Sequence, residues 1–96
     1  MYGLCGKISA LPNKRDELAE LLLQGSKDMQ GNLIYLVSKD NANSNDIFIT
    51  EVWDSKESHQ NSLQLESVQS AITKGKTLMT GFDSIAEFTP IGGNGI

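Results

Sequence analysis

The sequence predicts an α+β fold in which two helices cover one face of a four-stranded antiparallel sheet, in the order β-α-β-β-α-β. Two stretches carry apolar residues at a helical spacing, and each lies between stretches that read as strands. A segment rich in Asn, Asp and Ser, residues 39–45, separates the second strand from the third, which is typical of a polar hairpin loop. This order is that of the ferredoxin-like split βαβ arrangement.

The first half of the chain holds two predicted strands and one helix. Residues 2–9 read as a strand whose side chains alternate between two faces. A turn at residues 11–14 leads into a helix, which we expect to end at Gly31. Residues 33–38 read as the second strand. The predicted apolar face of the helix consists of Leu11, Leu18, Leu21, Leu22, Gly25 and Met29.

The second half repeats the pattern. Residues 46–53 form the third strand, paired antiparallel with the second across the polar loop. Ser55 is a good helix start, and a short helical segment is expected to hold His59. The main second helix spans residues 65–79 and is predicted to end at Gly81, followed by a last strand over residues 82–90. We predict a single domain over residues 1–96, with 91–96 as a flexible tail.

Composition narrows the possible partners. The net charge is −4 and the eight basic residues are scattered, which argues against nucleic acid and against an anionic membrane surface. The single cysteine, Cys5, cannot form an internal disulfide, and no signal-peptide pattern is visible, so we expect a cytoplasmic protein. One Cys and one His cannot build a His/Cys metal site, and no glycine-rich phosphate loop follows a strand. We therefore expect no His/Cys metal site and no nucleotide cofactor.

The second and third strands carry apolar residues on both faces. Residues 33–37 and 47–49 show no polar alternation, whereas an antiparallel sheet with one wet face normally alternates apolar and polar side chains. Two helices cover only one face, and monomers rarely expose large apolar patches. We therefore predict a homodimer packed sheet to sheet. The alternative is an apolar strand with modest exposure.

The junction between the third strand and the following helix is the candidate site. It holds the only tryptophan, Trp53, and the only histidine, His59. His59 is a candidate catalytic base because an unperturbed imidazole titrates near neutral pH. Trp53 is a candidate catalytic or pocket-lining aromatic. The alternatives are a solvated helix end for His59 and a core or interface anchor for Trp53.

Three further residues are candidate substrate contacts: Tyr35, Asn32 and Glu51. Tyr35 lies mid-strand and its hydroxyl needs a partner if its ring is buried. Asn32 also fits a simple turn position. Glu51 shares a strand face with Trp53, where it could orient a group in the pocket or pair with a lysine across strands.

Three segments resemble the antibiotic biosynthesis monooxygenase family. They are the Glu51-Val52-Trp53 strand end, the Asp54-Ser55-Lys56-Glu57 turn with the helix after it, and the closing Thr89-Pro90-Ile91-Gly92-Gly93. The order of elements is also similar, so the resemblance covers nearly the whole chain. The family consists of small dimeric α+β barrel proteins and includes quinol monooxygenases.

The resemblance implies an enzyme that oxygenates a quinol- or anthrone-like aromatic with dioxygen and needs no metal, flavin or haem. Once deprotonated, such a substrate itself donates electrons to dioxygen. The protein then needs an apolar pocket, a proton acceptor and aromatic walls. The resemblance implies that Trp53, Tyr35 and His59 supply them.

The chain departs from the family pattern at two positions. Some relatives carry an asparagine where this chain has Ile49, and many carry a histidine where it has Ser62. The haem-degrading branch needs a histidine on the long helix and an asparagine in the first strand; both are missing, so haem degradation is disfavoured. Two alternatives stay open: a small-ligand-binding or stress-response dimer without catalysis, and an isomerase or hydrolase on the same barrel.

Overall fold

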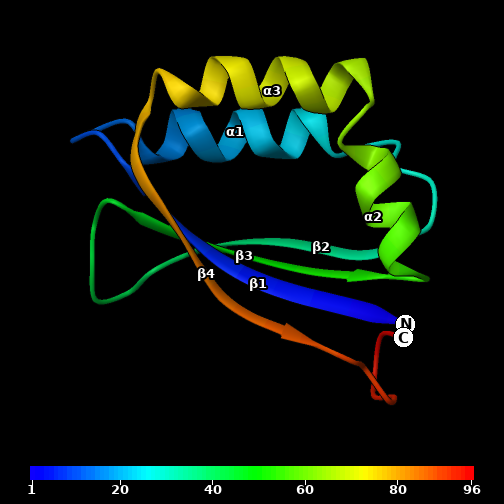
Figure 1. The fold of residues 1–96 in the computed structure, drawn as a ribbon. Helices are drawn as coiled ribbons and strands as arrows, with labels where there is room; N and C mark the ends of the chain where they lie inside the picture. Colours follow the sequence, from blue (N-terminus) through cyan, green and yellow to red (C-terminus); the bar gives the residue numbers. More distant parts are fainter.

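A four-stranded antiparallel sheet forms one layer of the protein, and three helices lie over one of its faces (Figure 1). The structure is a computed structural model and describes residues 1–96. The strand order across the sheet is β2-β3-β1-β4. In chain order the elements are β1 (Tyr2–Ala10), α1 (Arg15–Gly25), β2 (Asn32–Lys39), β3 (Asp46–Trp53), α2 (Lys56–Ser62), α3 (Glu66–Lys76) and β4 (Met79–Phe88).

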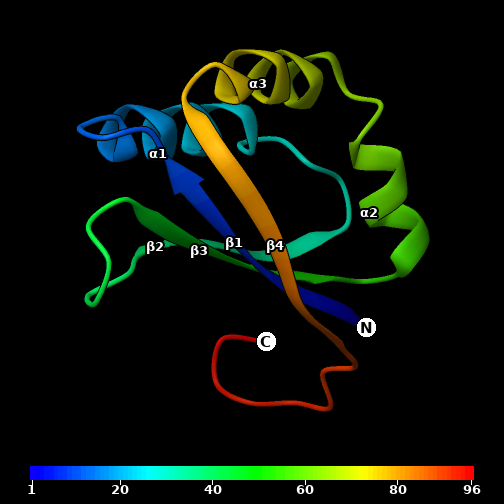
Figure 2. The same cartoon turned by 60° about the vertical axis from the view of Figure 1, so that its left-hand side comes forward.

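The predicted fold class is confirmed. The short helical segment expected around His59 is a separate helix before the main one, so the order is β-α-β-β-α-α-β. The hydroxyl of Ser55 accepts a 3.1 Å hydrogen bond from the backbone N–H of Ser58 and caps the start of α2. α2 then turns away from α3, and it closes one end of the space between the two layers (Figure 2).

Both predicted glycine stops are displaced. α1 ends at Gly25, before Gly31. Gly31 instead has φ of 84° just before β2, and a Cβ there would lie 2.5 Å from Oγ of Ser58. α3 ends at Lys76, and Gly81 lies inside β4, paired with Ser9. Sheet pairing of β4 with β1 therefore begins earlier than the glycine pattern indicates.

The centre of the fold lies between the sheet and α1. Five buried residues form it: Ile8, Ala10, Leu18, Ile47 and Ile49. Each aliphatic side chain that is fully removed from water contributes roughly 1.5–3 kcal/mol. β1 and β3 supply four of these five residues because they are the two central strands.

The opposite face of the sheet is not covered by any helix (Figure 1). Leu36 on this face is 53% exposed, and Phe88 is 39% exposed. A Cβ on Gly3 would lie 2.1 Å from the ring of Phe88, so the ring is seated on the glycine backbone. The predicted sheet-to-sheet dimer stays a prediction, as do the single-domain organisation and the cytoplasmic location. No helix in the structure is both long enough and apolar enough to cross a membrane.

Candidate functional site

A cavity of about 380 Å³ lies between the sheet and the helices, a volume in the range of small-molecule sites. Hydrophobic residues make up 14 of the 23 that line it. Most of them come from the central strands, from α1 and α3, and from the start of β4. Tyr35 is one of these 14, and Glu51, His59 and Ser62 also line the cavity. An apolar cavity with a few polar side chains suits a largely apolar ligand that carries a small number of hydrogen-bonding groups.

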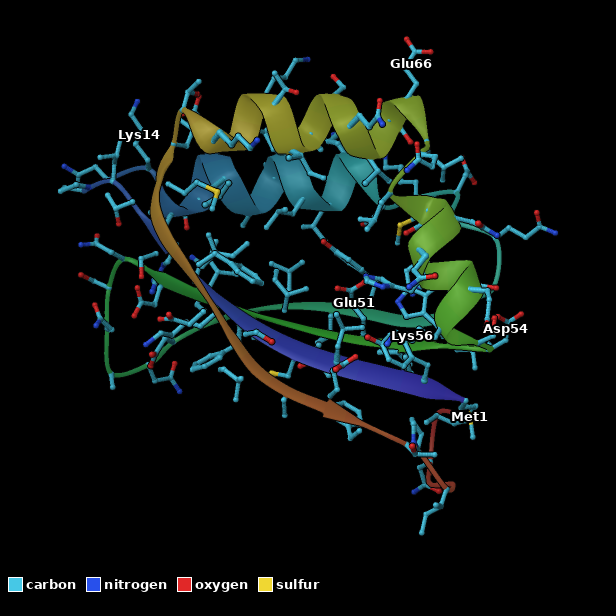
Figure 3. The ribbon with its side chains drawn as sticks, in the orientation of Figure 1. Met1, Lys14, Glu51, Asp54, Lys56 and Glu66 are labelled. Atoms are coloured by element: carbon cyan, nitrogen blue, oxygen red, sulfur yellow. The ribbon has the colours of Figure 1, made fainter.

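Glu51 extends from β3 into the space between the sheet and the helices (Figure 3). Its cross-strand partners are Leu4 on β1 and Tyr35 on β2. Its side chain is only 15% exposed. Burial raises the pKa of the Glu51 carboxyl above its ordinary value, while a hydrogen bond from Trp53 and the charge of His59 oppose that rise. Glu51 is therefore a stronger base than an exposed glutamate.

His59 lies on α2 between two aromatic rings. Its ring centroid is 5.4 Å from that of Trp53, in an edge-on arrangement, and 5.7 Å from that of Tyr2. Its Nε2 atom is 4.0 Å from Oε1 of Glu51. The imidazole thus packs against two aromatic rings and lies close to the carboxylate. The prediction that α2 carries His59 is confirmed, and the cavity brings His59, Glu51 and Tyr35 together.

Tyr35 reaches the cavity from β2. Burial raises the pKa of its phenol, and the charge of Glu51 raises it further. The hydroxyl therefore keeps its proton at neutral pH and can donate a hydrogen bond to a ligand.

The two other predicted site residues lie outside the cavity lining. Trp53 is fully buried, and its Nε1 atom donates a 3.1 Å hydrogen bond to Oε1 of Glu51. The side-chain amide of Asn32 donates to the backbone oxygens of Ile34 and Val52, at 3.0 Å and 3.4 Å. It holds the register shift that begins β2. Their catalytic and substrate-binding roles stay predictions.

A cluster around Tyr2 is not apparent from the sequence. The Tyr2 hydroxyl donates a 2.5 Å hydrogen bond to Glu87 on β4, which raises the pKa of Tyr2 to about 12. Lys56 lies 3.9 Å from the same Glu87 oxygen and 5.9 Å from the centre of the Tyr2 ring. These contacts connect α2 to β1 and β4 beside His59. The register of β1 with β3 places Tyr2 opposite Trp53 at the ends of the paired strands, which brings the cluster to the candidate site.

The two positions that depart from the family pattern both lie on the cavity wall. Ile49 is 5% exposed and supplies an apolar surface. Ser62 is also 5% exposed, and its hydroxyl donates a 2.6 Å hydrogen bond to the backbone oxygen of His59. No group of three or more His, Cys, Asp or Glu side chains is placed to hold a metal ion.

Comparison with known proteins supports the predicted fold and the family resemblance. The family model for antibiotic biosynthesis monooxygenases matches residues 1–74. No curated protein matches the chain. A crystal structure from Chloroflexus aurantiacus, assigned to these monooxygenases, is 47% identical with a TM-score of 0.93, and the match covers 97% of this chain and 95% of that one.

Two further structures with the same assignment extend the comparison. One from Deinococcus radiodurans is 29% identical with a TM-score of 0.81, covering 97% of this chain and 95% of that one. One from Nitrosomonas europaea is only 9% identical, but its TM-score is 0.84, with 96% and 100% covered, and it shows that the fold is shared. The family match spans most of the chain, and the chain belongs to the antibiotic biosynthesis monooxygenase family.

Proposed function

We propose that the protein is a cofactor-independent monooxygenase that oxidises a quinol- or anthrone-like aromatic with dioxygen. The observation that carries the proposal is the apolar cavity with Glu51, His59 and Tyr35 on its wall. The hydrophobic lining excludes water and suits a flat aromatic body, while the polar side chains can bind its oxygen atoms. Family membership supports a monooxygenase-type activity.

The proposed reaction balances without an external reductant. A hydroxyl of the hydroquinone loses its proton to the protein, and the resulting anion transfers an electron to dioxygen. The superoxide and substrate radicals combine to form a carbon–oxygen bond, which gives a hydroperoxide on the ring. Loss of the ring C–H proton, with cleavage of the oxygen–oxygen bond, leaves a hydroxyquinone and one water. All four electrons that reduce dioxygen come from the substrate.

We further propose that the protein acts as a homodimer packed through the open face of the sheet. Support comes from Leu36 and Phe88, which are exposed on that face although they are large and apolar. A sheet face packed against a second sheet would remove them from water. The cavity lies on the other side of the sheet, so one chain supplies its lining.

Non-catalytic binding of a small ligand is the second candidate function. Ile49 favours it, because an apolar side chain occupies the wall position where some relatives carry an asparagine. An isomerase or hydrolase reaction on the same fold is a third candidate. It would use the same proton acceptor but no dioxygen.

Oxygen uptake separates these candidates. The purified protein is mixed with naphthohydroquinone or anthrone, and oxygen consumption is compared with the uncatalysed rate. Use of isotopically labelled dioxygen should place one labelled atom in the product and one in water. Ligand-induced thermal stabilisation without turnover would instead favour the binding function, and turnover under anaerobic conditions would favour an isomerase or hydrolase.

A further inference from the structure

The two oxygens of the Glu51 carboxylate have different surroundings. Oε1 accepts the hydrogen bond of the Trp53 indole and lies 4.0 Å from Nε2 of His59. Oε2 accepts no hydrogen bond from any protein group, although Glu51 lines the cavity. A carboxylate that is fixed through one oxygen can offer the other to a ligand without reorganising.

His59 is less suited to contact the ligand first. Its ring is packed between Tyr2 and Trp53, and its side chain is only 18% exposed. Its Nε2 atom lies 4.0 Å from Oε1 of Glu51, the oxygen that already accepts the indole hydrogen bond. Tyr35 is also unsuited to accept a proton, because burial and the charge of Glu51 keep its hydroxyl protonated.

We infer that Oε2 of Glu51 accepts the hydrogen bond of a hydroxyl on the bound aromatic, and that Trp53 and His59 act through Glu51 as positioning residues. During turnover the same oxygen takes the hydroxyl proton; this catalytic half rests on the proposed function. The ligand class is an uncharged aromatic with a free hydroxyl. A ligand that carries its own negative charge at this end would be repelled by the carboxylate.

The ionisable groups near Glu51 come from several elements. His59 faces it from α2, Tyr35 from β2, and Tyr2 from β1 with its β4 partner Glu87. Lys76 on α3 also lines the cavity, whereas α1 contributes only residues that do not ionise. Burial raises the pKa of Glu51, and the positive charge of His59 lowers it. Removal of His59 should therefore raise the pKa of Glu51 rather than abolish its titration.

Binding of para-nitrophenol tests whether Glu51 accepts the hydrogen bond of the ligand hydroxyl, without any oxygen chemistry. The Glu51→Gln variant keeps an oxygen for the Trp53 indole but presents an NH₂ donor to the cavity in place of an acceptor. Below the pKa of the phenol, we expect this variant to bind para-nitrophenol roughly tenfold more weakly than the wild type. Para-nitroanisole, which lacks the hydroxyl, should bind both proteins equally.

A matched control removes a carboxylate elsewhere. Glu66→Gln makes the same chemical change on the exposed start of α3, far from the cavity (Figure 3), and should leave both affinities unchanged. Circular dichroism establishes that each variant is folded. Equal para-nitrophenol affinity in the wild type and Glu51→Gln, or no measurable binding to the wild type, would overturn the inference.

The pH dependence of oxygen uptake tests whether Glu51 takes the hydroxyl proton during turnover. Glu51→Gln should lower the rate at least about 100-fold and remove the acidic limb of the profile. His59→Phe, which keeps an aromatic ring between Tyr2 and Trp53, should retain that limb and move it to higher pH. Loss of the limb in His59→Phe but not in Glu51→Gln would make His59 the base. If the wild type takes up no oxygen, the monooxygenase proposal fails, while para-nitrophenol binding still decides the role of Glu51.

Discussion

The indole N–H of Trp53 donates a 3.1 Å hydrogen bond to Oε1 of Glu51, two residues back along the same strand. Side chains two positions apart on a strand point to the same face, so β3 alone brings the pair together. The fully buried ring gives Glu51 a fixed support. This relationship makes Trp53 part of the structure that holds the carboxylate.

Replacement of Trp53 should lower the free energy of unfolding, and the loss should be larger when the whole ring is removed than when only the indole N–H is removed. Because the ring is fully buried, Trp53→Ala should lower the free energy of unfolding by roughly 3–5 kcal/mol. Trp53→Phe keeps an aromatic ring but leaves Oε1 of Glu51 without its donor, and should cost about 1–3 kcal/mol. Urea unfolding followed by circular dichroism measures both. A negligible change in the alanine variant would mean that the ring is not buried in solution.

Ionisation of Glu51 should make stability depend on pH. Burial raises its pKa in the folded state above the ordinary value, which the unfolded chain retains. Between these two values the folded protein binds more protons than the unfolded chain, so the free energy of unfolding falls as pH rises through this interval. Above the folded-state pKa the loss is complete. Urea unfolding across mildly acidic to neutral pH measures it.

The Glu51→Gln variant isolates this contribution, because it cannot ionise. It should match the wild type at the acidic end and be more stable than the wild type near neutral pH. Glu66→Gln on the exposed surface should follow the wild-type curve. Identical curves for the wild type and Glu51→Gln would show that the carboxylate ionises without a desolvation penalty.

Gly25 marks the close contact between α1 and α3. A Cβ there would lie 2.6 Å from Cβ of Ala71 and 3.2 Å from the backbone oxygen of Ser67. Gly25→Ala should therefore force the helices apart and lower the free energy of unfolding by about 1–3 kcal/mol, despite the better helix propensity of alanine. Gly81→Ala, which meets nothing within 4 Å, is the matched control. Thermal or urea unfolding distinguishes the two.

A charged residue on the open sheet face should disrupt the proposed dimer. Leu36→Asp would bury a carboxylate between the two sheets, so sedimentation velocity should show a shift from dimer to monomer. Leu23→Asp is the control, because Leu23 is 46% exposed on α1, away from the open sheet face. A wild-type protein that sediments as a monomer, or a Leu36→Asp variant that remains dimeric, would contradict the sheet-to-sheet arrangement.

The apolar stretches and the loop composition were sufficient to predict the sheet and its connections. Residues 46–53 form β3 as expected, because the continuous apolar residues 47–49 and the polar loop before them both act locally. The glycines that were expected to end the helices were less informative about where the helices end. Gly31 and Gly81 both lie beyond the helices they were expected to end, since tight packing at Gly25 and pairing of Met79 with Ala10 decide where α1 and β4 meet their neighbours.

The sequence by itself determined the fold class, the family, and the strand-to-helix junction that carries Trp53 and His59, because periodicity and short motifs depend on neighbouring residues. Only the tertiary structure decided how the junction's side chains are arranged. It places His59 beside Glu51 across elements, puts Glu51 on the wall of an apolar cavity with no protein hydrogen bond to Oε2, and joins Trp53 to Oε1 of the carboxylate. These relations depend on how α2 folds back over the sheet, and therefore on contacts between residues distant in the chain.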